Sequence, residues 1–161
     1  MQTVIALRAG PLAEEDLSVR RVWGREALSQ PFAFEIEFHR IDDDPVALAD
    51  LVGADALLSI RRPDGPERHV HGILWSVEMV EVVQGKPRYR ARLVPKLERL
   101  RHVRRSRVFQ KLSVPEVVAK VLDEAAVKYR RSLTGSYAPR EYCVQYREPD
   151  LVFVSRLLED E

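Results

Sequence analysis

The histidine pair His69 and His71 is the first place where this sequence could do chemistry. One valine separates the two residues in the segment RHVHGILW. Alternate side chains of a strand point to the same face, so two imidazoles at this spacing could ligate one metal ion. No carboxylate or thiol stands at a spacing that would complete the metal shell. We therefore favour an ordinary strand surface, keep metal binding as the alternative, and expect no metal or cofactor.

The other reactive side chains are isolated from one another. Cys143 is the only cysteine and lies in the alternating run REYCVQY, where we interpret it as a small buried core thiol. The acidic run Asp42 to Asp44 lacks the glycine and the distal acid of a calcium loop, so we interpret it as a solvated turn. The chain contains no nucleophile elbow, phosphate loop or zinc-protease motif. We predict no enzyme; an active site built on the histidine pair or Cys143 is the alternative.

An arginine-rich run, RLRHVRRSRVFQK, is the sharpest charge feature. We favour a solvated connection between two parts of the fold. A protein interface comes second, since arginine is enriched at interfaces, and a phosphate-binding patch third. The candidate interface residues are Arg99, Arg101, Arg104, Arg105, Arg107 and Lys111.

Composition limits the classes of protein. The 161 residues carry 26 Lys and Arg against 25 Asp and Glu, a balance that argues against a dedicated nucleic-acid binder. Hydrophobic residues make up 45%, enough for a real core, and a single cysteine fits synthesis in a reducing compartment. The first residues lack the apolar core of a signal peptide, and no apolar run reaches the ~20 residues of a membrane span. We expect synthesis in the cytoplasm and any export by another route.

The first two-thirds of the chain alternates with the period of a half-buried strand. In FAFEIEFH the apolar residues Phe32, Phe34, Ile36 and Phe38 share one face, and in HGILWSVEM we expect Ile73, Trp75, Val77 and Met79 to do so. In RYRARLV the residues Tyr89, Ala91 and Leu93 oppose three arginines. Further strands are expected at residues 56–60, 3–8 and 17–25. Six strands joined by short turns predict an antiparallel barrel or sandwich.

The last third has the period of helices. Ser113 and Glu116 form a predicted capping box with Pro115 in the first turn, and an apolar stripe follows in VVAKVLDEAA. A short strand, REYCVQY, precedes a closing helix that starts near Pro149. We predict a mainly β fold with α (α+β): a barrel domain over residues 1–112, then a helix–strand–helix segment over residues 113–161.

The C-terminal segment REYCVQYREPDLVFVSRLLEDE closely resembles REYCVQYRESDxxFVxRLxEEEG of VgrG proteins, the spike proteins of type VI secretion systems. Upstream, FAFEIEF, HGILWSVE, YRARLVPKLERL and VFQKLSVPEVVAKVL also resemble segments of that family, so the likeness runs from about Leu17 to Glu161. Two departures are Pro149, where the family has a Ser or Thr helix cap, and Glu98, where it has an apolar residue.

The resemblance implies a structural role and no catalysis. It implies a phage tail hub-like barrel in the base of the spike, a homotrimer that sits on the Hcp tube and carries the needle tip and effector proteins. It implies no small-molecule substrate, no specific nucleic acid, and export by the secretion apparatus itself. The closing acids Glu159, Asp160 and Glu161 have the wrong sign for a helix end, so we expect a fragment of a longer protein. The hub of a contractile phage tail or phage-like particle is the alternative, followed by a nucleic-acid-binding barrel.

Overall fold

The computed structural model describes residues 3–42, 44–63 and 65–161 and divides the chain into two compact units, residues 1–95 and 96–161. This division differs from the predicted boundary at residue 112. The reason is a strand that the sequence analysis did not anticipate, β7 (Arg104–Leu112), which pairs with β8 (Arg140–Pro149) inside the second unit.

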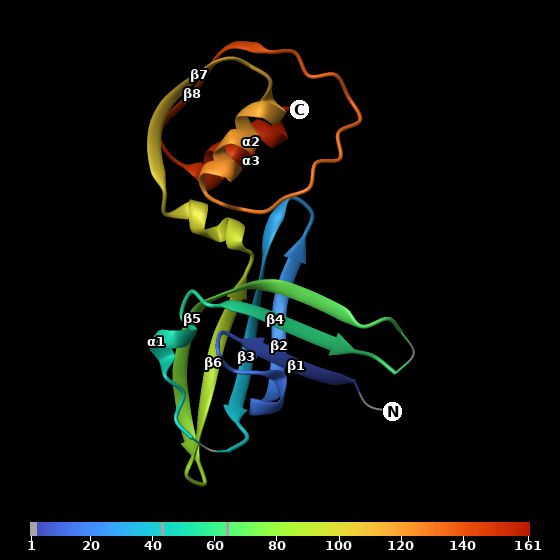
Figure 1. Ribbon diagram of the computed structural model, residues 1–161, viewed down its shortest axis with the longest axis vertical. Coiled ribbons are helices and arrows are strands. Elements are labelled where there is room, and N and C mark those ends of the chain that lie inside the picture. Colours follow the sequence, from blue (N-terminus) through green and yellow to red (C-terminus); the bar gives the residue numbers. More distant parts are fainter. Residues whose placement is uncertain (1–2, 43, 64) are drawn as a thin grey trace. The chain divides into compact units, whose positions relative to one another are not determined.

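The first unit is a curled, antiparallel six-stranded sheet, and each of its strands was predicted (Figure 1). Its spatial order is β1-β4-β5-β6-β3-β2. The outer strands β1 and β2 approach each other, but no hydrogen-bonded ladder joins their described residues, so the sheet is a half-barrel. The strands are β1 (Val4–Ala9), β2 (Leu17–Ala27), β3 (Gln30–Arg40), β4 (Asp55–Arg61), β5 (Arg68–Val83) and β6 (Lys86–Val94). The 3-10 helix η1 (Glu14–Asp16) and the one-turn helix α1 (Leu48–Leu51) occupy two of the connections.

The core of the first unit follows the predicted alternation in β3 and β6. Phe34, Ile36 and Phe38 are buried, and Phe38 stacks on Tyr89 at 5.7 Å between ring centroids. The Tyr89 hydroxyl accepts a hydrogen bond from the Val46 backbone N–H at 2.9 Å, so this buried phenol keeps a polar partner.

The predicted face of β5 is correct only in part: Ile73 is buried and Val77 packs against the core, whereas Trp75 and Met79 lie outside the core cluster. Leu74, not Trp75, belongs to the core cluster, and Met79 is 55% exposed. A bulge between Leu74 and Ser76 inserts one residue, which exchanges the two faces of the strand at that point. After the bulge, Val77 is the residue that packs against the core.

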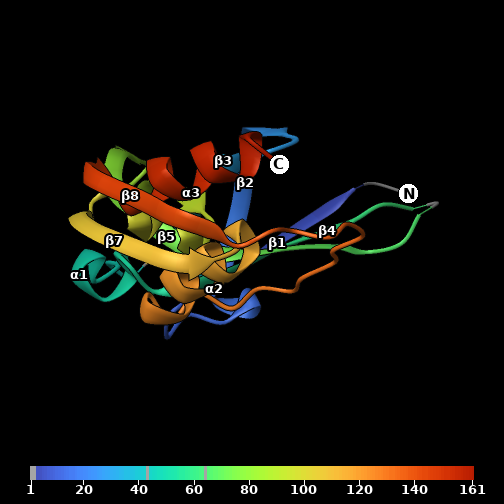
Figure 2. The same ribbon diagram turned by 90° about the horizontal axis from the view of Figure 1, so that it is seen from above.

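The second unit packs helices α2 (Val114–Glu124) and α3 (Asp150–Glu159) against the curved β7–β8 ribbon, as Figures 1 and 2 show. The 3-10 helix η2 (Lys96–Arg101) lies against α3. The predicted capping box is confirmed: the Ser113 N–H and hydroxyl both donate to Glu116 Oε2 at 2.7 Å. Phe109 and Phe153 stack at 5.7 Å in the core, which also buries Cys143.

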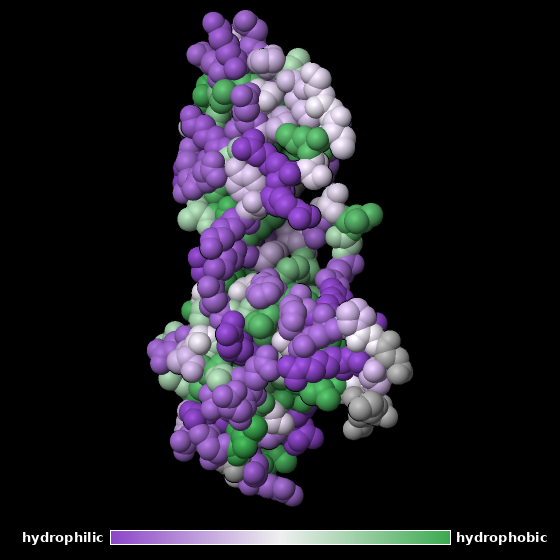
Figure 3. All heavy atoms as spheres, turned by 45° about the vertical axis from the view of Figure 1, so that its right-hand side comes forward, coloured by the Kyte–Doolittle hydropathy of each residue, from purple (hydrophilic) through white to green (hydrophobic). Residues whose placement is uncertain are grey.

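On the face drawn in Figure 3, hydrophilic side chains predominate and apolar ones form small separate groups. Among the described helices, none has the length and apolar character needed to cross a membrane.

Candidate interface and the other predicted sites

The arginine-rich run forms part of the second unit's own framework. Arg99 and Arg101 lie in η2, where Arg101 pairs with Glu98, and Arg99 is also engaged with a neighbour. Arg104, in β7, donates to the carbonyl oxygen of Arg147 at 3.0 Å. The run therefore forms a helical turn and a strand of the second unit, and most of its cations are exposed.

Arg107 and Asp150 form the centre of a polar network under the ribbon. Asp150, the first residue of α3, is 1% exposed. Its Oδ1 accepts from Arg107 Nη2 at 3.1 Å and from Gln145 Nε2 at 2.7 Å. Arg107 also donates to Gln145 Oε1 at 2.7 Å and to Glu124 Oε2 at 2.5 Å, and Arg105 donates to the same Glu124 oxygen at 2.9 Å. Two of the six candidate cations are thereby neutralised inside the unit.

Among the six candidate residues, Lys111 is the one with a positive φ angle. It is exposed, and its φ of 54° places it in the left-handed region at the end of β7. That the six residues together form an interface stays a prediction.

The outer face of the β7–β8 ribbon carries exposed apolar groups. Val108 and Val144 pair across the strands and are 56% and 51% exposed, while Tyr142 and Tyr146 on β8 are 63% and 68% exposed. Arg147 lies over the Tyr146 ring at 5.5 Å.

The histidine pair lies on β5, with its ring centroids 6.4 Å apart. His69 Nδ1 is 3.2 Å from the hydroxyl of Ser59, which is 1% exposed and donates to Glu14 Oε1 at 3.2 Å. The hydroxyl lies between imidazole and carboxylate, whereas a catalytic triad needs the imidazole in the middle. Within residues 3–42, 44–63 and 65–161, no group of three or more His, Cys, Asp or Glu side chains could hold a metal ion.

Cys143 is buried, as predicted. Burial raises the pKa of its thiol against the opposing effect of Arg140 and Arg156, so the thiolate is disfavoured. In the acidic turn, Asp42 is exposed, pairs with Arg40 and accepts from the Asp44 N–H at 3.1 Å, and Asp43 lies outside the described residues.

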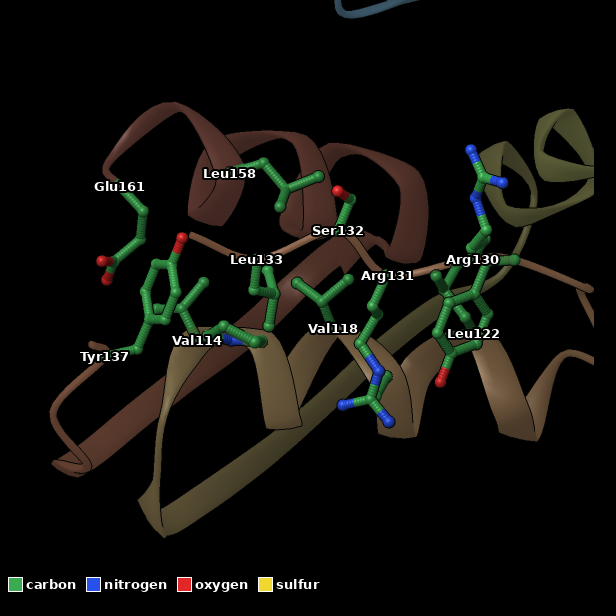
Figure 4. Close-up of a pocket in the computed structure, with 13 residues that line it drawn as sticks. Val114, Val118, Leu122, Arg130, Arg131, Ser132, Leu133, Tyr137, Leu158 and Glu161 are labelled. Atoms are coloured by element: carbon green, nitrogen blue, oxygen red, sulfur yellow. The ribbon is translucent and has the colours of Figure 1, made fainter. Parts of the chain in front are cut away.

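A pocket of about 360 Å³ lies within the second unit, between α2, the end of α3 and the loop over residues 129–137 (Figure 4). Val114, Val118, Leu133 and Leu158 point toward one another inside it. Its lining residues include no histidine or cysteine.

Rows of alternating charge on the outer face of the first unit's sheet were missed by the sequence analysis. Arg90 of β6 donates to Glu37 of β3 at 2.8 Å and lies 3.6 Å from Glu78 of β5. Arg92 lies 3.8 Å from Glu35. The hydrogen bond from Arg90 to Glu37 raises the pKa of this guanidinium above its already high ordinary value. The signal was the alternation of FEIE and RYRAR, but only the register brings these charges together.

Trp23 on β2 completes this face. It is 37% exposed, and the guanidiniums of Arg21 and Arg90 lie over its ring at 4.9 and 5.6 Å from the centroid. Stacking of cations on an indole is favourable and fixes the two side chains near the sheet surface.

The sequence of this chain is similar to a known family and to proteins of known role. Residues 25–161 match the family described as phage tail baseplate hub (GPD). The chain is 36% identical over 162 residues to the type VI secretion system spike protein VgrG1b of Pseudomonas aeruginosa, covering 99% of the chain and 22% of that protein. It is 41% identical to VgrG5 of the same organism, covering 99% of the chain and 20% of that protein.

A solved structure has a similar fold. The Escherichia coli protein c3393, described as a component of the type VI secretion system with structural similarity to the T4 bacteriophage tail proteins gp27 and gp5, superposes with a TM-score of 0.79 at 30% identity over 94% of this chain and 42% of that one. The chain spans about a fifth of the length of the two Pseudomonas relatives. It belongs to the phage tail baseplate hub family and corresponds within it to the N-terminal region of the VgrG spike proteins.

Proposed function

We propose that this chain is part of the base of a type VI secretion spike, and that the complete base is a homotrimeric hub. The hub caps the Hcp tube and carries the needle and effector proteins. The observation that carries this proposal is the identity of 36% and 41% to two spike proteins over 99% of the chain. The curled half-barrel supports it, because the solved relative with the same fold is a component of that apparatus.

The role is structural. The described site residues support this: the Ser59–His69–Glu14 contacts have the wrong order for nucleophilic catalysis, and Cys143 is buried with a raised pKa. The half-buried, internally paired Arg107 and its neighbours do not suit phosphate binding, which requires cations free to meet a nucleic-acid backbone. The chain is exported by the secretion apparatus itself, as part of the spike.

The hub of a contractile phage tail is the second candidate, because the matching family is described as a phage tail baseplate hub. Genes for a secretion sheath and membrane complex beside the source gene would favour the spike, and capsid and portal genes would favour the phage particle.

A chimera tests the proposal directly. The corresponding N-terminal region of VgrG1b is replaced by this chain, and release of Hcp into the medium is measured in a strain that depends on that spike. We expect release comparable to that of native VgrG1b. A chimera that is stably produced yet releases no Hcp, while the native protein restores release, would contradict the proposal.

A further inference from the structure

The histidine pair of β5 has no part in the proposed function. His69 and His71 are both exposed, whereas Val70 between them is only 5% exposed and belongs to the core. Because side chains alternate along a strand, both imidazoles lie on the outward face of the sheet. Their ring centroids are 6.4 Å apart, with an angle of 53° between the ring planes. The two rings are therefore neighbours on one accessible surface.

A buried hydroxyl determines which ring nitrogen of His69 carries the proton. Ser59 of β4 is the cross-strand partner of His69 and is 1% exposed. Its hydroxyl oxygen lies 3.2 Å from Glu14 Oε1 and 3.2 Å from His69 Nδ1. A carboxylate can only accept, so the single hydroxyl proton is donated to Glu14, and the Nδ1–H of His69 must donate to the Ser59 oxygen. In the neutral imidazole, Nε2 is then the nitrogen that carries a lone pair.

This arrangement is the one that supports a metal-binding histidine. Such a histidine almost always donates its second ring N–H to an acceptor, which fixes the ring and makes the ligating nitrogen more basic. Ser59 is that acceptor for His69, and Glu14 orients the hydroxyl. Arg61 lies 3.5 Å from the other oxygen of Glu14 and is itself paired with Glu67 at 2.8 Å. Three consecutive contacts therefore hold His69 in place.

We propose that His69 and His71 together bind one divalent transition-metal ion, Cu²⁺ most tightly, on the outer face of the first unit's sheet. Metal–nitrogen bonds of about 2 Å place the centroids of two imidazoles on one ion roughly 5–6 Å apart. A small rotation of the exposed His71 side chain reaches that separation from the observed 6.4 Å. The site goes beyond the proposed structural function and does not depend on it.

The number and type of ligands select the metal. Imidazole suits Cu²⁺, Ni²⁺ and Zn²⁺, and Cu²⁺ has the highest affinity of the three in the Irving–Williams order. Two nitrogens with water oxygens in the remaining positions fit the tetragonal geometry of Cu²⁺. Zn²⁺ sites usually have three or four protein ligands, and no third His, Cys, Asp or Glu joins this pair in the described part of the chain. We therefore expect Zn²⁺ to bind more weakly than Cu²⁺.

Calorimetric titration of Cu²⁺ into the tag-free chain tests the site. The variants are His71→Ala and, as the matched control, His102→Ala, which removes an exposed histidine of the second unit. We expect one ion per chain for the unmodified protein and the control, and binding weaker by about tenfold or more for His71→Ala. Electron paramagnetic resonance of the Cu²⁺ complex should show two imidazole nitrogens in the unmodified protein and one in His71→Ala. Circular dichroism establishes that each variant is folded.

Ser59→Ala tests the positioning of His69. Without the hydroxyl, Nδ1–H loses its acceptor, so Cu²⁺ affinity should fall about tenfold while the resonance spectrum still shows two nitrogens. A variant whose strand had simply collapsed would lose both nitrogens. Unchanged affinity in Ser59→Ala would remove Ser59 from the site and overturn this part of the proposal.

The two-histidine site is overturned if the unmodified chain binds no Cu²⁺ at millimolar concentration. It is also overturned if His71→Ala and His102→Ala weaken binding equally, because the ion would then be held elsewhere. Release of Hcp by the chimera is a separate measurement. A chimera that releases Hcp while the chain binds no Cu²⁺ leaves the proposed function standing without this site, and Cu²⁺ binding without Hcp release gives the reverse.

Discussion

Substitution of Asp150 should destabilise the second unit selectively. Asp150 is almost fully buried and accepts hydrogen bonds from Gln145 and Arg107, while Arg105 Nε lies 3.6 Å from its second oxygen. Asp150→Ala leaves the guanidinium of Arg107, whose side chain is 17% exposed, without this carboxylate. Removing one partner of a buried pair costs about 3–5 kcal/mol. Arg107 keeps Glu124 and Gln145, so we expect about 3 kcal/mol, at the low end of that range.

The two units offer separate probes. Both tryptophans, Trp23 and Trp75, lie in the first unit, whereas the two long helices α2 and α3 lie in the second. Urea unfolding is followed by tryptophan fluorescence and by circular dichroism at the helix band. With a urea slope of about 1.5 kcal/mol/M, a loss of about 3 kcal/mol lowers the midpoint of the helix signal by about 2 M. The tryptophan midpoint should stay unchanged.

Two further variants make the result specific. Asp150→Asn keeps an acceptor oxygen but loses the charge, and should cost about 1–2 kcal/mol, less than alanine. Asp160→Ala removes an exposed acid that lies 3.7 Å from Arg140 and should change stability by less than about 1 kcal/mol. If Asp150→Ala moved the helix midpoint no more than Asp160→Ala does, the network would not support the unit, and the reasoning would be refuted.

Three other predictions concern single residues. A Cβ at Gly72 would lie 2.2 Å from the Val94 carbonyl oxygen, so Gly72→Ala should lower the tryptophan-detected stability by about 1–3 kcal/mol, while Gly65→Ala, whose nearest neighbour is at 3.9 Å, should change it by less than about 0.5 kcal/mol. Burial raises the pKa of Cys143, so a thiol reagent at about pH 8 should label the native chain far more slowly than the urea-unfolded chain; equal rates would contradict its burial. Hydrogen bonds from the Ser113 hydroxyl and N–H lower the pKa of Glu116 below its ordinary 4.5 in the folded chain. As pH falls, the unfolded chain therefore binds this proton before the folded chain does. The stabilisation is complete above pH 4.5 and is lost as pH falls through the lower pKa of the folded chain. Glu116→Gln should remove that part of the acid sensitivity of the helix signal, and an unchanged pH profile would contradict the capping role.

Local patterns were sufficient for most elements. Period-two alternation located the six strands of the first unit, and the Ser113–Glu116 box located the start of α2. These signals depend on neighbours within a few residues, where backbone geometry alone decides which side chains share a face. β7 was missed because RRSRVFQK has too few apolar residues to show alternation, and its strand conformation depends on pairing with β8. In β5 the core position passes from Leu74 to Val77 across a bulge, which the sequence analysis could not place because a bulge is set by packing across the sheet.

The sequence by itself determined the class of this protein: an alternating, mainly β chain with two amphipathic helices, no catalytic motif, and a C-terminal segment that resembles the spike family. Tertiary structure alone decided which charges meet. Glu37 and Arg90 are 53 residues apart and Arg107 and Asp150 are 43 apart, so no local pattern relates them. Strand register brings the first pair onto an exposed face, and the second pair joins β7 to the buried first residue of α3. A one-residue change in register would separate both pairs, because each step along a strand exchanges its two faces.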